Sequence, residues 1–368
     1  MLTLHVIQAE YGDCLILEYG TQSNPKYVLI DGGPPGTYEA HLRAGLEKIS
    51  QGGGRLDLAI ASHVDDDHIV GLLRLMEELR RQRANGVAET VEIDSLWHNS
   101  FSQTIGTDND IETRLKALHA NTRSFADVMT LTNAAVRGIG EGSQLRSAAL
   151  ALGIPINSDL ISVDEAQRPI RSADGLRLYI VGPTKKNLEE LKTEWLAWLH
   201  KHETSRLTTK ETAATADEGV PNLSSIMVLA EDEATGKRLL LTSDGRGDHL
   251  SDGLKQAHLL SREGTLHVDV LKVPHHGSDR NVTKEFFKTV TADKYVISAN
   301  GKYGNPDLDT LVWIVEAARE QGRTIEIFAT NQTQSTRQLV EKYDPKVYGY
   351  SLVQMDEESD SMPLEVAA

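Results

Sequence analysis

The sequence predicts an α/β fold that opens with an antiparallel sheet and continues with alternating helices and strands. The chain opens with strand patterns at 3–9, 14–19 and 27–30, which turn signals such as Asn24-Pro25 separate into an antiparallel meander. From Glu39 onward, stretches with helical spacing alternate with strand patterns. Several of these strands end in carboxylate or imidazole side chains. Strand ends that converge on one edge of two packed sheets would form a cleft for a metal there.

The remaining elements follow from hydrophobic periodicity and turn residues. Helices are expected over 39–50, 69–83, 187–202, 253–260, 283–290 and 308–321. Strands are expected over 58–62, 93–97, 160–162, 176–181, 225–230, 238–242, 268–273, 295–298 and 324–329. Residues 1–355 are expected to form one domain, and the acidic stretch at 356–368 is expected to be a disordered tail.

Composition narrows the class of protein. The chain has 368 residues, of which 39% are hydrophobic and 25% charged, as is ordinary for a soluble globular protein. No apolar stretch approaches the ~18–20 residues that a membrane-spanning helix needs, and the N-terminus does not resemble a signal peptide. Cys14 is the single cysteine, so no internal disulfide is possible. We therefore expect a cytoplasmic protein that does not associate with membranes.

The net charge of −16 argues against a protein that coats nucleic acid through bulk electrostatics, because phosphate binding requires a basic face. A nuclease that grips a few nucleotides through bound metals does not need a basic surface. Charge therefore disfavours nucleic acid as a partner without excluding it.

The stretch from Leu58 to His68 carries the strongest chemical signal. An apolar run that is typical of a buried strand ends in His63-Val64-Asp65-Asp66-Asp67-His68, which places two imidazoles and three carboxylates in six residues. Carboxylates this close raise one another's pKa unless a cation neutralises them. Imidazole and carboxylate are ordinary ligands of divalent metals. The loop therefore predicts a metal site.

This loop resembles the His-x-His-x-Asp-His signature of the metallo-β-lactamase superfamily, with Asp65 where the second His is usual. The variant is similar to that of the ComEC-type hydrolase domain of DNA-uptake proteins and its free-standing relatives. Five further stretches resemble motifs of that subgroup: Tyr11 to Ile16, Leu29 to Gly33, Asn222 to Ser225, Leu241 to Asp244, and His275 to Ser278. The resemblance implies a four-layer αββα metallo-β-lactamase sandwich. Residues 101–157 and 184–218 fall outside it and are expected to be helical insertions.

The resemblance also implies a dinuclear site with two divalent ions. Asp67, His68 and one of His275 and His276 would hold one ion. His63 and Asp65 would hold the other, and Asp244 would bridge the two. The usual His of the third motif is absent, and Asn222 or Ser225 occupies that region. An Asp in place of an imidazole makes the site richer in oxygen, which shifts preference from zinc toward manganese or magnesium.

Several residues are candidates for roles beside the ions. Asp67 is a candidate to activate the nucleophile, although its position favours ligation. His98 is a candidate to protonate a leaving group, with a polar loop histidine as the equal alternative. Ser278 and Asn300 are candidates to contact a phosphate, and Asp13 and Asp31 to brace ligand histidines, with a purely structural role as at least an equal alternative for these four. Asn222 is a further candidate for a substrate contact.

An extended backbone would point the side chains of His275 and His276 in opposite directions, so one ligand is expected from that pair.

These features favour a metal-dependent phosphodiesterase or nuclease that acts on DNA or RNA through a metal-activated hydroxide. The first alternative is a hydrolase of small esters, lactones or lactams, which would prefer zinc. The second is a metal-binding effector module with little or no turnover, which the missing third-motif His motivates.

Overall fold

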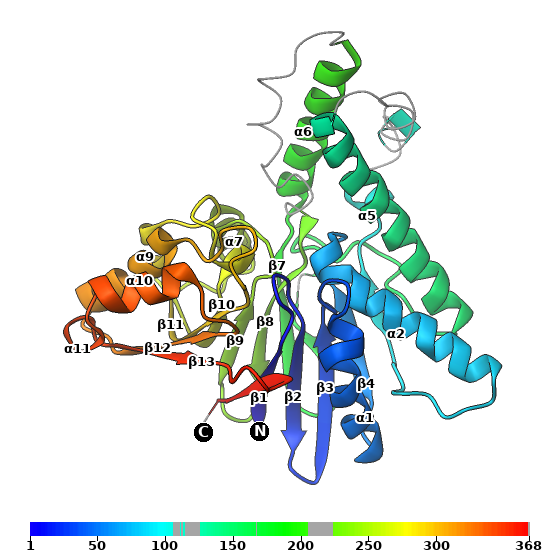
Figure 1. The fold of residues 1–368 in the computed structure, drawn as a ribbon, viewed down its shortest axis with the longest axis horizontal. Coiled ribbons are helices and arrows are strands. Elements are labelled where there is room, and N and C mark those ends of the chain that lie inside the picture. The colour runs from blue at the N-terminus through cyan, green and yellow to red at the C-terminus, as the bar shows by residue number, and fades with distance from the viewer. Residues whose placement is uncertain (106–110, 112, 115–125, 167, 205–223, 367–368) are drawn as a thin grey trace.

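Two β-sheets pack face to face and helices cover their outer faces (Figure 1). The computed structural model describes residues 1–105, 111, 113, 114, 126–166, 168–204 and 224–366. The four-layer α/β architecture predicted from the sequence is confirmed.

The first sheet has the strand order β14-β1-β2-β3-β4-β5. Its strands are β1 (Leu2–Ile7), β2 (Leu15–Thr21), β3 (Asn24–Ile30), β4 (Leu56–Ala61), β5 (Leu96–His98) and β14 (Ser361–Glu365). β1, β2 and β3 pair antiparallel, which confirms the predicted meander. β4 joins β3 in parallel, and β5 joins β4 in parallel.

The second sheet has the order β13-β12-β11-β10-β9-β8-β7-β6. Its strands are β6 (Ile170–Arg171), β7 (Leu176–Gly182), β8 (Met227–Asp232), β9 (Arg238–Leu241), β10 (Leu266–Lys272), β11 (Val290–Ile297), β12 (Ile325–Ala329) and β13 (Tyr350–Gln354). β8 and β9 form the predicted antiparallel hairpin. From β9 to β13 all neighbours are parallel, so their carboxyl ends share one edge.

Three hydrophobic clusters hold the layers together. Between the sheets, side chains such as Leu17, Ile60 and Leu241 are almost fully buried. Outside the first sheet lie a π-helix, η1 (Tyr38–Leu42), and the helices α1 (Arg43–Gln51) and α2 (Asp66–Ala84). Outside the second sheet lie α7 (Gly247–Gln256), α8 (Lys284–Thr289), α9 (Leu308–Glu320), α10 (Gln334–Lys342) and α11 (Pro345–Tyr348). No helix in these described ranges combines the length and apolar character needed to cross a bilayer.

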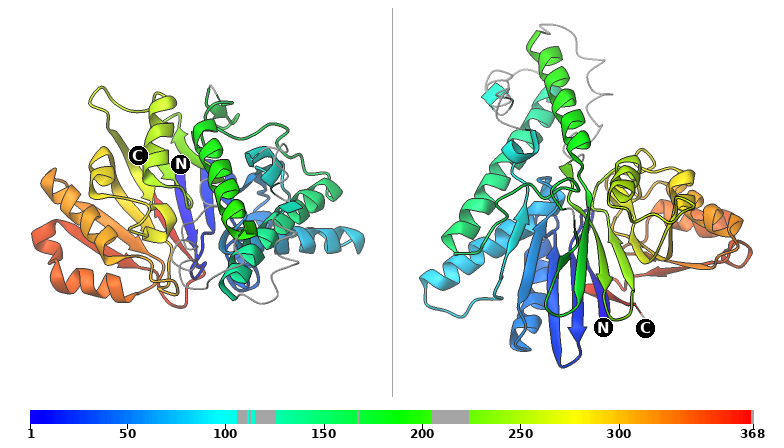
Figure 2. Two further views of the ribbon diagram at one scale, coloured as in Figure 1. Left: turned by 90° about the horizontal axis from the view of Figure 1, so that it is seen from above. Right: turned by 180° about the vertical axis from the view of Figure 1, so that it is seen from behind.

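The two predicted insertions contribute helices that extend beyond the sandwich (Figure 2). The first contains α3 (Phe101–Ile105) and α5 (Ala126–Ala151), and the second contains α6 (Lys185–Thr204). The C-terminal half of α5 packs on α2 through Leu145, Ala148 and Ala149, so it belongs to the outer helical layer. A separate cluster joins α6 to Ile139 of α5. Within the predicted insertions, residues 106–110, 112, 115–125 and 205–218 lie outside the described part.

The expectation of a disordered tail at 356–368 is wrong for Ser361–Glu365, which form β14 along β1. Met362 and Leu364 are buried in the core between the sheets, and they alternate with more exposed side chains. The acidic run before them hides this short period-two pattern in the sequence. β14 covers an edge that β1 would otherwise leave unpaired.

The expected strand at 160–162 is also wrong. The side-chain amide of Asn99 takes over the backbone pairing of Ile161: it donates to the carbonyl and accepts from the N–H, both at 2.8 Å. These bonds satisfy the segment without a neighbouring strand.

The first turns of α2 approach the loop after β3 through glycine. A Cβ at Gly71 would lie 1.8 Å from the carbonyl oxygen of Gly32. We expect Gly71→Ala to lower the free energy of unfolding by about 1–3 kcal/mol through overpacking, although alanine favours helices by about 1 kcal/mol. Urea unfolding measures the change. Gly45→Ala in α1, where a Cβ meets nothing within 4 Å, is the control and should not destabilise. Equal losses in both variants would contradict the expectation.

Candidate metal centre

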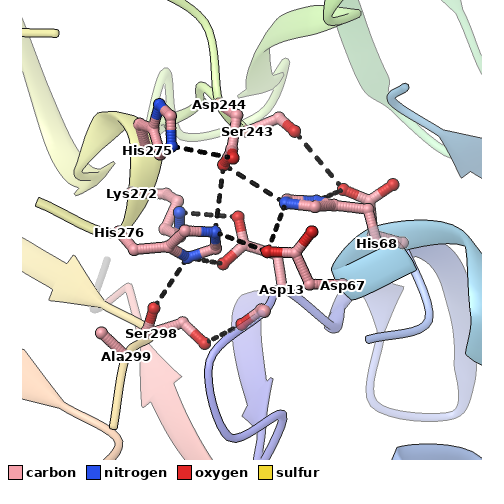
Figure 3. A network of polar contacts seen from close by, with 12 residues as sticks. Asp13, Asp67, His68, Ser243, Asp244, Lys272, His275, His276, Ser298 and Ala299 are labelled. Carbon is pink, nitrogen blue, oxygen red and sulfur yellow. Dashed lines mark hydrogen bonds and ion pairs between the residues drawn. The ribbon is translucent and has the colours of Figure 1, made fainter. Parts of the chain in front are cut away.

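The predicted ligands follow the carboxyl ends of three strands, and Asp31, predicted to brace a ligand, follows a fourth. Figure 3 shows five of the predicted ligands, Asp67, His68, Asp244, His275 and His276, gathered at one site. Asp31 follows β3, residues 63–68 follow β4, Asp244 follows β9, and the histidine pair at 275 and 276 follows β10. α2 begins at Asp66, three residues earlier than the helical spacing predicted. Asp67 and His68 therefore lie in its first turn, and the helix orients both side chains.

The carboxylate of Asp244 lies at the middle of the cluster. Its Oδ1 is 3.3 Å from Nε2 of His68 and 3.3 Å from Nε2 of His276. Its Oδ2 is 3.6 Å from Nε2 of His275 and 4.0 Å from Nε2 of His63. One buried carboxylate thus faces four imidazoles from two segments, one after β4 and one after β10.

Two further carboxylates flank it. Oδ2 of Asp67 is 3.4 Å from Nε2 of His276 and 3.9 Å from Nε2 of His68. Oδ2 of Asp65 is 3.6 Å from Nε2 of His63. One ligand atom each from Asp67, His68, Asp244 and His276 lie within 4.8 Å of one another. The structure thus brings together all seven residues predicted as ligands.

The neighbours of the imidazoles determine which ring nitrogen faces the cluster. Nδ1 of His68 is 2.8 Å from Oδ2 of Asp31, the bracing contact expected from the sequence. Nδ1 of His276 donates to the carbonyl oxygen of Ser298 at 2.8 Å. Because a carboxylate and a carbonyl can only accept, Nδ1 carries a proton, and Nε2 is the nitrogen that faces the cluster and can bind a metal once its own proton is displaced.

The described residues supply no hydrogen-bond partner to several of the atoms that point inward. These buried atoms, which contact one another only as close charged groups, are Nε2 of His63, His68 and His276 and Oδ1 of Asp244. Buried polar atoms are costly without a partner. A divalent cation accepts these lone pairs directly, so the residues present fit a metal.

The imidazoles and carboxylates of the site shift one another's pKa values. Burial alone would raise the pKa of Asp244, but the neighbouring imidazoles, led by His276 and His68, hold it well below its usual range. Burial opposes charge on His68 as well, yet Asp244 and Asp67 raise its pKa well above its usual value. A metal replaces those imidazole protons when it binds, so metal affinity must fall as the pH falls.

A left-handed backbone conformation at three residues orients the side chains of the site. Ser243, His275 and His276 have φ values of 46°, 45° and 54°, which non-glycine residues rarely adopt. The expectation that the two side chains point in opposite directions assumed an extended backbone, and that assumption is wrong. In the left-handed conformation both rings face Asp244, at 3.6 Å from His275 and 3.3 Å from His276. That the pair supplies one ligand stays a prediction, and the group of potential ligands that lie closest together includes His276.

Comparison with known proteins finds a family match for the N-terminal part of the chain, which carries part of this site. Residues 10–123 match the family model of the metallo-β-lactamase superfamily. The match contains Asp31 and the ligand loop 63–68, and Asp244 and the histidine pair lie beyond it. One solved structure, a new diphosphatase from the PhnP family, aligns with a TM-score of 0.39 and 10% identity, covering 99% of this chain and 98% of that one. No curated protein matches the chain.

The closer resemblance of this chain to ComEC-type hydrolases stays a prediction. Asn222, which belongs to one of the motifs that carry it, lies outside the described residues.

A cleft of about 880 Å³ opens beside the candidate metal centre and is lined by Asp67, His275 and His276. Ser278 and Asn300 line it as well, and their contact with substrate stays a prediction. Other lining residues were not predicted as substrate contacts, among them Tyr11, Arg246, Arg280, Lys302 and Tyr303. Glu194 of α6 also reaches the cleft, so the second insertion contributes to its wall.

His98 does not lie in this wall. It is buried beneath α5, where a Cβ at Gly142 would come within 3.0 Å of its Nε2. Burial, assisted by Arg146, lowers the pKa of His98 to about 4. The imidazole is therefore neutral at pH 7 and has no proton to spare for a leaving group, so its predicted role as a general acid lacks support.

A buried ion pair underlies the centre, and the sequence analysis missed one half of it. Nζ of Lys272 lies 2.6 Å from Oδ2 of Asp13, and both side chains are almost fully buried. Oδ1 of Asp13 is 3.4 Å from Nδ1 of His276. Burial would raise the pKa of Asp13, but Lys272 and His276 outweigh it and lower the pKa. The pair places a fixed charge behind a predicted ligand.

Proposed function

We propose that this chain is a metal-dependent hydrolase of phosphodiester bonds, with nucleic acid as the favoured substrate class. The observation that carries the proposal is the oxygen-rich ligand set: Asp65, Asp67 and Asp244 stand among the imidazoles with their oxygens 3.3–3.6 Å from the nearest Nε2 atoms. Such a set favours manganese or magnesium, which are common partners of phosphate esters.

Asp67, His68, Asp244 and His276 would hold one ion, and His63, Asp65 and Asp244 a second. Divalent ions supply a hydroxide near neutral pH and polarise a phosphoryl oxygen. Asp31 and the Ser298 carbonyl keep His68 and His276 in the tautomer that offers Nε2. The cleft beside Asp67 and His275 would receive the substrate. The ComEC-type resemblance of the His63–His68 loop supports the same substrate class.

The test compares hydrolysis of single-stranded DNA, bis(4-nitrophenyl) phosphate and 4-nitrophenyl acetate with added Mn²⁺ or Zn²⁺, together with the metal content of natively purified protein. We expect Mn²⁺-dependent cleavage of the two phosphodiesters and its loss in Asp67→Ala and His68→Ala, since both remove a ligand. Glu77→Ala, which removes an exposed carboxylate from α2, is the control.

Three outcomes would contradict the proposal. Turnover of the acetate alone with zinc would favour the ester or lactone hydrolase. Tight metal binding without turnover of any substrate would favour the effector module. Phosphodiester cleavage that survives both ligand substitutions would arise from another site or a contaminant.

A further inference from the structure

One aromatic side chain at the cleft is exposed and lies outside the hydrophobic core. Tyr303 is 70% exposed and lies in the loop between β11 and α9. An aromatic ring left in water forgoes the burial that usually places it in a core. The ring lines the same cleft as Asp67, His275 and His276. Its place in this wall suggests that it serves a ligand.

Tyr303 belongs to a small cluster with Tyr11 and Lys302. The two tyrosine rings meet edge to face, with centroids 5.4 Å apart and planes at 88°. Nζ of Lys302 lies 3.5 Å from the centroid of the Tyr11 ring and 5.1 Å from that of Tyr303. The contact with Tyr11 fixes the orientation of the exposed ring, and the ammonium places a positive charge beside it.

The cluster is tied to the metal centre through the backbone that carries it. The hydroxyl of Ser298 donates to the carbonyl of Gly12 at 2.5 Å, and its own carbonyl accepts from His276. The side-chain amide of Asn300 donates to the carboxylate of Glu10 at 2.8 Å. These bonds join the loop of Tyr11 to the loop of Tyr303. The aromatic cluster is therefore held in position relative to the ligands.

We propose that Tyr303, supported by Tyr11 and Lys302, stacks on a nucleobase next to the phosphodiester at the metal centre. The proposal rests on the proposed function and adds a base-binding subsite beside the same centre. A net charge of −16 offers a polynucleotide no general attraction, so local contacts must supply the affinity. Stacking on an aromatic ring is sequence-tolerant, and the adjacent ammonium suits a flanking phosphate.

Two chromogenic phosphodiesters with one leaving group test the subsite: thymidine 5′-(4-nitrophenyl phosphate) and methyl 4-nitrophenyl phosphate, each with metal-loaded protein. We expect kcat/KM to favour the nucleoside ester. Tyr303→Ala should reduce the ratio of the two values about tenfold, the order of magnitude of one base stack. Tyr303→Phe, which keeps the ring, should retain it. Val347→Ala, at an exposed position of α11, is the control.

A binding measurement separates the subsite from the chemistry. Calorimetry compares thymidine 5′-monophosphate with 2-deoxyribose 5-phosphate, which lacks the base. We expect Tyr303→Ala to erase the preference for the nucleotide. If that preference is present and depends on Tyr303 while no diester is hydrolysed, the subsite stands and the proposed function falls. If diesters are hydrolysed but Tyr303→Ala leaves both ratios at the wild-type value, the subsite is wrong.

Discussion

Asp244→Ala should abolish phosphodiester hydrolysis and metal binding together. The carboxylate is almost fully buried and lies within 4.0 Å of the Nε2 atoms of four imidazoles. Its removal leaves those imidazoles without the charge that binds a dication beside them. We expect kcat/KM to fall by more than about 10³-fold, because metal-assisted hydrolysis loses most of an enhancement of ~10⁶-fold or more.

The measurement pairs kinetics with metal content. Wild-type protein stripped with chelator should regain stability when Mn²⁺ is added back, since binding to the native state alone raises its free energy of unfolding. Asp244→Ala should show no such thermal shift. Asp252→Ala removes the same charge from an exposed position on α7 and should retain both metal and activity. A variant at Asp244 that still binds two ions and turns over would remove this residue from the centre.

Candidate functional residues could be predicted from the sequence where they are neighbours in the chain. The loop from His63 to His68 could be recognised because five ligand-type side chains follow one apolar strand. Its partners Asp244 and His276 are about 180 and 210 residues further on, and only the family resemblance linked them. The hydrophobic pattern predicted both sheets and most helices, because burial of one face dictates that pattern.

Where the sequence-based predictions missed features of the site, the cause lies in backbone conformation or in contacts between residues far apart in the chain. His98 was expected just after a strand, but it is the last residue of β5 and α5 from an insertion covers it, which the local sequence does not show. The histidine pair adopts left-handed backbone, which the alternation rule for extended strands cannot anticipate. Lys272 ends a strand, a place where a lysine is normally solvated. Its burial depends on Asp13, about 260 residues earlier in the chain.

Lys272→Met should be the most destabilising substitution outside the ligands. Lys272 and Asp13 are at most 1% exposed, and the ammonium also donates to the carbonyl of Val273 at 3.1 Å. Removing one partner leaves the Asp13 carboxylate buried without its counter-charge, which costs about 3–5 kcal/mol. Urea unfolding of the metal-free protein measures the loss free of any contribution from metal binding.

Two further variants serve as controls for this prediction. Lys237→Met breaks a pair of similar length, 2.9 Å to Asp269, but its side chains are 32% and 20% exposed. Solvent screening limits that loss to about 1 kcal/mol. The double variant Asp13→Asn with Lys272→Met removes both charges and should be more stable than Lys272→Met alone, because no unpaired charge remains. If Lys272→Met cost no more than Lys237→Met, the buried pair would not be holding Asp13 ionised behind His276.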